Sequence, residues 1–157
     1  MTSSGICASS GSEHKATTAM ADVLVDANFL IAIGYPRDRN HTKAKTFAAA
    51  TTDRLLIPDV VLVEAMYNLQ RLGGTPAAGE YARLLLTEST PFLSLTTSDY
   101  TRAVDILNIY QDVPLDFVDC CLTALAERLE ITRICTFDRR DFMIIRPTHT
   151  DYFELLP

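Results

Sequence analysis

The stretch Asp22-Val23-Leu24-Val25-Asp26 has the pattern of a short apolar strand that ends in a carboxylate. The same pattern returns near the end of the chain, where Asp138 follows Ile134-Cys135-Thr136-Phe137. Between these two places, strand-like and helix-like patterns alternate, which is typical of an α/β domain with a mostly parallel sheet. We therefore expect a central sheet of four to five strands, flanked by helices.

The expected elements follow from apolar runs and the turn residues between them. Strands are expected at residues 22–25, 55–57, 92–95 and 133–136, with a possible edge strand at 142–145. Helices are expected at 41–50, 59–72, 75–86 and 116–129, and another helix is expected to be capped by Ser98. The pair Gly73-Gly74 should end one helix, because glycine readily adopts the conformation that follows a helix, and Thr75-Pro76 should start the next.

Length and composition favour one domain. The chain has 157 residues, of which 48% are hydrophobic, enough for one substantial core. Residues 1–21 are rich in Ser, Thr, Ala and Gly, so we expect a flexible N-terminal segment followed by a domain over 22–157. The chain has no membrane-length apolar run and no signal-peptide pattern at its start, so we expect a soluble, cytoplasmic protein without a membrane partner.

Charge and cysteine content narrow the function classes. A net charge of -6 argues against a protein that holds nucleic acid by a broad basic surface. The positively charged residues Arg37, Arg39, Lys43 and Lys45 could still contact phosphates. They could also be ordinary solvent-exposed charges without a binding role. The four cysteines lack Cys-x-x-Cys spacing, and we interpret them as reduced core thiols.

Four acids, Asp26, Glu64, Asp119 and Asp138, lie at strand ends or within apolar stretches. The carboxyl ends of parallel strands face one crevice, so these distant acids can converge there. Carboxylates at close range repel by roughly 4 kcal/mol per pair at an effective dielectric near 20, so such a cluster needs protons or a cation. Oxygen ligands without His or Cys favour Mg²⁺ or Mn²⁺ over zinc.

Further polar residues accompany this set. Asn28 lies two positions after Asp26 and can support its carboxylate, while Thr136 can orient its neighbours near the fourth strand. Asparagine at position 28 counts against haloacid-dehalogenase-type phosphatases, which need a second aspartate there. Asp116 shares a helix face with Asp119 and could be either a helix cap or an additional acid of the site.

The chemistry that this set favours is phosphodiester hydrolysis. The sequence has no nucleotide-binding glycine loop and no Gly-x-Ser-x-Gly motif. Metal ions held by carboxylates can activate water for in-line attack and stabilise the departing oxygen. We therefore interpret the chain as a nuclease.

Four motifs together resemble the PIN-domain ribonucleases. They are Val-Leu-Val-Asp26-Ala-Asn28, Val-Val-Leu-Val-Glu64, Asp116-Phe-Val-Asp119 and Thr136-Phe-Asp138-Arg-Arg-Asp-Phe. Their order and spacing cover nearly the whole chain after Ala21, and the chain is most similar to the VapC toxins of type II toxin–antitoxin modules. The resemblance implies a Rossmann-like PIN domain and a metal-dependent endoribonuclease that uses Mg²⁺ or Mn²⁺, cleaves RNA, is neutralised by a cognate antitoxin and commonly forms a homodimer.

The resemblance also assigns roles. Asp26, Glu64 and Asp119 match the three metal-holding acids, and Asp138 matches a more variable fourth. Asn28 matches a supporting position, and Asp116 remains an alternative to Asp119 as the direct ligand. Arg37, Arg39, Lys43 and Arg139 are candidate RNA contacts. Two alternatives stay open, a PIN nuclease of housekeeping RNA processing and a catalytically silent PIN-like module that binds RNA or protein.

Overall fold

The computed structural model describes residues 20–87 and 90–157. Within these ranges five strands form one sheet in the order β3-β2-β1-β4-β5, and every pairing is parallel. The strands are β1 (Asp22–Val25), β2 (Arg54–Pro58), β3 (Phe92–Leu93), β4 (Arg133–Cys135) and β5 (Glu154–Leu156). The prediction of an α/β domain with a parallel sheet of four to five strands is confirmed.

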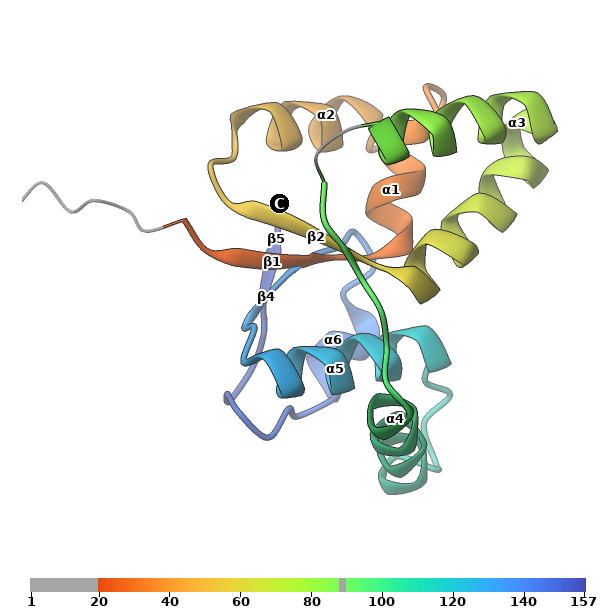
Figure 1. Cartoon of the computed structure of the whole chain (residues 1–157). Coiled ribbons are helices and arrows are strands. Elements are labelled where there is room, and N and C mark those ends of the chain that lie inside the picture. The colour runs from red at the N-terminus through yellow and green to blue at the C-terminus, as the bar shows by residue number, and fades with distance from the viewer. Residues whose placement is uncertain (1–19, 88–89) are drawn as a thin grey trace, which may run out of the picture.

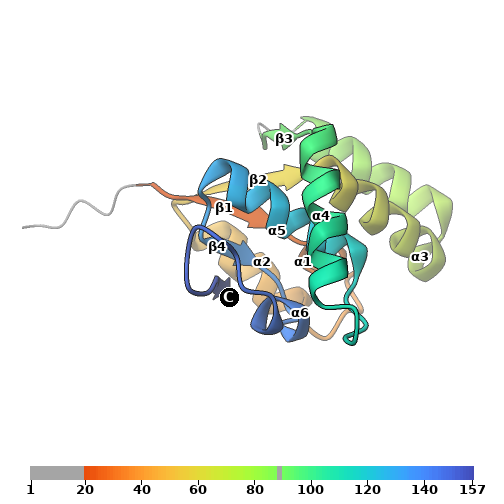
Figure 2. The same ribbon diagram turned by 90° about the horizontal axis from the view of Figure 1, so that it is seen from below.

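Helices cover both faces of the sheet. The layer on one face contains α1 (Ala27–Gly34), α2 (His41–Ala50) and α3 (Asp59–Thr87) (Figure 1). The other face carries α4 (Thr97–Ile109), α5 (Phe117–Leu129) and α6 (Arg140–Ile144), which lie together on the near side in Figure 2. This three-layer arrangement explains why β1 and β4 are almost wholly apolar, because strands covered on both faces have no solvated side.

The core lies where the central strands meet the two helix layers. Val23, Leu24 and Ile134 are fully buried, and Phe29 of α1 and Leu125 of α5 pack from opposite sides. The interpretation of the cysteines as core thiols is confirmed for the three that the structure describes, since each is free and buried: Cys120, Cys121 and Cys135. Cys7 lies outside the described residues. No helix in the described ranges is long and apolar enough to cross a membrane.

The expected break at Gly73-Gly74 is confirmed. Gly74 has φ +83° and ψ 164°, and it divides α3 into two helices that meet at a kink. A positive φ is strained for residues with a Cβ, so glycine is the residue that this position requires. The first half of α3, which carries Glu64, leads away from β2, and the kink at Gly74 changes the direction of the second half.

Two local predictions are wrong. The segment 142–145 is not an edge strand but belongs to α6 and its C-cap, and the edge is β5. Phe142 and Ile145 are buried while Met143 is exposed, which is the spacing of a helical turn. The helix expected after Ser98 is instead capped by Thr96, whose side chain accepts the Asp99 N–H while Asp99 accepts the Thr96 N–H.

Two further elements were not anticipated. Helix α1 was not expected, and the structure forms it directly after Asp26, whose side chain accepts the Ala27 N–H. Strand β5 was not expected either, because three residues give too short a pattern to stand out. Of the N-terminal segment 1–21, residues 1–19 lie outside the described residues, and Ala21 donates its N–H to Asp53 Oδ1 at 3.1 Å.

Candidate functional site

The predicted acids come together at the carboxyl ends of the central strands. Asp26 directly follows β1, Asp138 follows β4, and Glu64 lies early in the helix that leaves β2. Asp119 lies in the first turn of α5. A cavity of about 220 Å³ opens among them, lined by Asp26, Asn28, Ile31, Glu64, Asp116, Asp119, Asp138, Arg140 and Asp141. The sequence-based prediction that distant acids converge there agrees with this geometry.

Asp26 is the most constrained of these acids. It is 4% exposed, and its Oδ1 accepts the Ala27 N–H at 2.6 Å. Its Oδ2 accepts the Thr136 hydroxyl at 2.8 Å and the Asn28 amide. Asn28 Oδ1 accepts the Phe137 N–H at 2.7 Å, which fixes the amide orientation. The predicted supporting positions, Asn28 and Thr136, therefore hold the Asp26 carboxylate in one orientation.

Three acids that line the cavity have raised pKa values. Burial raises the pKa of Asp26 to about 6 and that of Glu64 to about 7, and neighbouring carboxylates add to both shifts. Burial raises the pKa of Asp119 to about 9, with the charges of Asp26 and Asp116 as the next causes. Desolvation and like charges both disfavour the ionised form, so these carboxyls gain from either a proton or a cation.

Asp116 and Asp119 differ in what they already bind. Asp116 is exposed and is the N-cap of α5, with its Oδ1 accepting the Val118 N–H at 2.7 Å. Asp119 is half-buried one turn further on, and its backbone carbonyl accepts the Thr123 hydroxyl. The cap role of Asp116 leaves Asp119 as the acid that we favour as the direct ligand.

Asp138 lies at the rim. Its side chain is exposed, and its Oδ1 accepts the Arg140 N–H at 3.2 Å, so it closes the turn between β4 and α6. Its own N–H donates to Thr136 Oγ1 at 3.1 Å. Asp138 is thereby linked through Thr136 to Asp26.

Sequence reasoning missed Asp141. This residue is 2% exposed, lines the same cavity and accepts the Arg140 Nε at 2.6 Å. Burial alone would raise the pKa of Asp141, but the Arg140 guanidinium and the Asp116 N–H hold it below its usual range. Its place three residues after Asp138, on the same short segment, was a signal that could have identified it.

The donor chemistry of the cavity fits a hard divalent cation. The lining offers carboxylate and amide oxygens, whereas no His or Cys belongs to it. In the arrangement of the described side chains, no three His, Cys, Asp or Glu residues already form a set that could hold one ion. An ion would therefore draw the carboxylates inward as it neutralised their repulsion.

The predicted RNA contacts divide into two kinds. Arg39 lines a second cavity of about 350 Å³ that shares Asn28, Ile31 and Asp138 with the acidic one, and the Lys43 Nζ lies 5.8 Å from the Phe137 ring centroid. Arg37 is exposed in the segment before α2. Arg139 instead donates to the carbonyl oxygens of Leu155 and Pro157, so it anchors β5.

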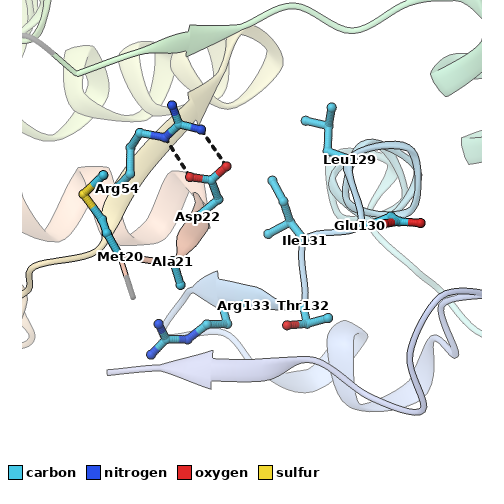
Figure 3. Close-up of a pocket in the computed structure, with 9 residues that line it drawn as sticks. All are labelled: Met20, Ala21, Asp22, Arg54, Leu129, Glu130, Ile131, Thr132 and Arg133. Atoms are coloured by element: carbon cyan, nitrogen blue, oxygen red, sulfur yellow. Dashed lines mark hydrogen bonds and ion pairs between the residues drawn. The ribbon is translucent and has the colours of Figure 1, made fainter. Parts of the chain in front are cut away.

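A larger cavity, of about 550 Å³, lies at the amino-terminal ends of the strands, which we call the amino edge of the sheet (Figure 3). Asp22 and Arg54 form two hydrogen bonds there, at 2.6 and 2.7 Å, as the dashed lines in Figure 3 show. Arg133 pairs with Asp53 at 2.5 Å and with Glu154 at 2.9 Å. Asp22 and Asp53 at this edge are both bound to arginines, so we assign the candidate site to the smaller, acidic cavity.

Comparisons with known proteins identify the family of the chain. The model of the PIN domain family matches residues 23–145. The curated ribonuclease VapC26 of Mycobacterium tuberculosis is 24% identical over 135 residues, which are 86% of this chain and 100% of the relative.

Solved structures share the fold. VapC20 of Mycobacterium tuberculosis, described as a sarcin-ricin loop cleaving toxin, has a TM-score of 0.73 and 24% identity, over 82% of this chain and 98% of that one. A toxin–antitoxin complex from Klebsiella pneumoniae has a TM-score of 0.58 and 21% identity, over 84% and 99% of the two chains. VapBC2 from Rickettsia felis, solved bound to a promoter DNA fragment, has a TM-score of 0.64 and 11% identity, over 87% and 99%.

Proposed function

This chain belongs to the PIN-domain family, and on that premise we propose that it is an endoribonuclease that depends on Mg²⁺ or Mn²⁺ and serves as the toxin of a toxin–antitoxin pair. The expected family membership is confirmed by the match over residues 23–145. A ribonuclease relative and toxin–antitoxin complexes among the structural neighbours support the activity and the antitoxin partner.

One observation carries the proposal. Asp26, Glu64 and Asp119 line a single cavity, and burial, with a smaller contribution from neighbouring carboxylates, raises the pKa of each. A structural carboxylate normally has a cationic partner or a set of hydrogen-bond donors that lowers its pKa. Such a cluster is costly to the fold, which supports the proposal that the site binds a cation.

We assign different roles to the residues of the proposed site. Asp26, Glu64 and Asp119 would hold the cation, with Asp138 at the rim as a fourth acid. Asn28 and Thr136 keep the Asp26 carboxylate oriented, which preserves its geometry when the other side chains move inward. A bound divalent cation supplies activated water and stabilises charge on a phosphodiester.

Substrate and partners complete the proposal. Arg37, Arg39 and Lys43 are the cations that we assign to RNA phosphates, and Arg39 is supported by its place in the adjoining cavity. Arg139 is a weaker candidate, because its guanidinium already binds two backbone carbonyls. We also propose a homodimer, as the family resemblance implies, and a cytoplasmic location, as the sequence pattern indicates.

The test is cleavage of a mixed RNA pool by the purified protein with Mg²⁺, with Mn²⁺ and with a chelator. We expect cleavage with either ion and none with the chelator. Glu64→Gln should abolish cleavage, while Glu80→Gln, an exposed acid on the second half of the same helix, should leave it unchanged. Cleavage that persists in the chelator, or in the Glu64 variant, would contradict the proposal. Growth arrest on expression that a neighbouring small gene product relieves would separate a toxin from a housekeeping nuclease.

A further inference from the structure

Asp141 connects two segments of the site that are far apart in the sequence. Its Oδ2 accepts the Asp116 N–H at 2.7 Å, across 25 residues, and its Oδ1 accepts the Arg140 Nε at 2.6 Å. Arg140 in turn donates from Nη2 to the Pro114 carbonyl at 3.1 Å. The pair therefore ties the start of α6 to the residues that lead into α5.

These two segments carry two of the acids. Asp119 follows Asp116 by one helical turn, and Asp138 precedes Asp141 by three residues. The Asp141 bond is made to the N-cap residue itself, so it fixes the position where α5 begins. Any movement of this N-cap relative to α6 would change the separation of Asp119 from Asp138.

Asp141 is already bound within the protein, so we assign it a supporting role and not that of a ligand. Both of its oxygens already accept a hydrogen bond at 2.7 Å or less, one of them from a guanidinium. The side chain is 2% exposed, whereas Asp119 is only half-buried and faces the cavity without a guanidinium partner among the described residues. A carboxylate bound in this way supports neighbouring groups.

We propose that Asp141, with Arg140, is a positioning residue that sets the spacing of Asp119 and Asp138 for a divalent cation. This inference rests on the proposed function and adds a residue outside the four acids. Partners behind metal ligands typically contribute about 10–100-fold to metal affinity. Loss of the Asp141 bonds should weaken binding by about tenfold or more on that basis.

The chain offers a matched control in Asp99. This aspartate is also 2% exposed, accepts a backbone N–H at 2.7 Å, from Thr96, and accepts an arginine Nε at 2.8 Å, from Arg128. It lies at the start of α4 and does not line the acidic cavity. Asp99→Asn and Asp141→Asn should therefore cost similar stability, while only the second should affect the site.

The experiment is titration of metal-free protein with Mn²⁺ at fixed pH, with the bound ion counted by electron paramagnetic resonance and Tm recorded for each variant. We expect the Kd for Mn²⁺ to rise about tenfold or more in Asp141→Asn and to stay at the wild-type value in Asp99→Asn. Equal Kd values in wild type and Asp141→Asn, or an equal rise in both variants, would overturn the inference.

The variant Arg140→Gln distinguishes a positioning role of Arg140 from an effect of its positive charge alone. Its side chain is 60% exposed, so this variant should fold even where Asp141→Asn does not. Removal of a positive charge beside the acids should strengthen Mn²⁺ binding if only charge matters. If Arg140 helps to position the acids, the variant should bind Mn²⁺ more weakly than wild type. Tighter Mn²⁺ binding would overturn the inference. A wild-type protein that bound no Mn²⁺ would contradict the proposed function as well, so the two failures are distinguishable.

Discussion

Aspartates lie at both the amino edge of the sheet, where the strands begin, and the carboxyl edge, where they end, and their pKa values are shifted in opposite directions. At the edge where the strands begin, Asp22 and Asp53 are bound to arginines, and hydrogen bonds lower the pKa of each. At the edge where the strands end, burial raises the pKa of Asp26 and Asp119. The two pairs of aspartates therefore differ in whether an arginine binds the carboxylate, not in residue type.

Cavity size would have suggested the opposite choice. The cavity at the amino edge is about 550 Å³, more than twice the 220 Å³ of the acidic one. Three charged residues that line it are nevertheless paired, because Asp22 binds Arg54 and Arg133 binds Asp53. An unsatisfied charge that costs stability indicates a function more directly than open volume does.

The largest expected effect compares Asp26→Asn with Asp22→Asn. We expect Asp26→Asn to lower the rate of RNA cleavage by more than about 100-fold, since even partners behind a ligand typically contribute up to that much. Asp22→Asn, at the other edge, should cleave at the wild-type rate. Rates under single-turnover conditions, with circular dichroism to verify folding, measure both. Equal losses in the two variants would remove the functional distinction between the edges.

A second prediction concerns stability without metal. Asp119→Asn should raise the Tm of the metal-free protein at pH 8, because the unfolded chain leaves this carboxyl ionised while the folded site favours its protonated form, and asparagine is neutral in both states. Each unit of pKa shift corresponds to about 1.4 kcal/mol, which exceeds the 0.3–1 kcal/mol typical of an acid at a helix N-terminus. A lower Tm than wild type at pH 8 would mean that the carboxylate stabilises the fold.

The acids and strands were predictable because their signals are local. Asp26 and Asp138 each follow an apolar run, and parallel pairing then brings them together. The position of the edge strand was not predictable, because the apolar residues of α6 resemble a strand, and only the three-residue spacing of buried Phe142 and Ile145 in the structure shows a helical turn. Asp141 was missed for a related reason: its partner, the Asp116 N–H, lies 25 residues away and leaves no pattern in the sequence.

A third prediction concerns pH. The folded-state pKa of Asp119 is raised to about 9, so the folded protein binds a proton that the unfolded chain releases above its ordinary value near 4. The stability of the metal-free protein should therefore fall as pH rises across this interval, and less steeply in Asp119→Asn. Thermal unfolding at several pH values checks the slope.

Metal should reverse this trend. At pH 6, Glu64, with its pKa near 7, and Asp119 hold protons that compete with a cation, whereas more of these carboxyls are ionised at pH 8. Mn²⁺ should thus raise Tm more at pH 8 than at pH 6, and Asp119→Asn should narrow the difference. An equal rise at both pH values would show that the protons and the cation do not share these groups.

The smallest effect is expected at the amino edge, and its sign should be opposite. Arg54 lowers the pKa of Asp22, so this pair stabilises the protein above the ordinary pKa of aspartate, and that contribution is lost as pH falls through the lowered value. The Arg54 and Asp22 side chains are 51% and 38% exposed, so solvent screening makes the contribution of this pair to stability small. Asp22→Asn should leave Tm almost unchanged at pH 7, and the gap to wild type should vanish in acid. A large loss at pH 7 would mean that the paired edge contributes more to the fold than exposure allows.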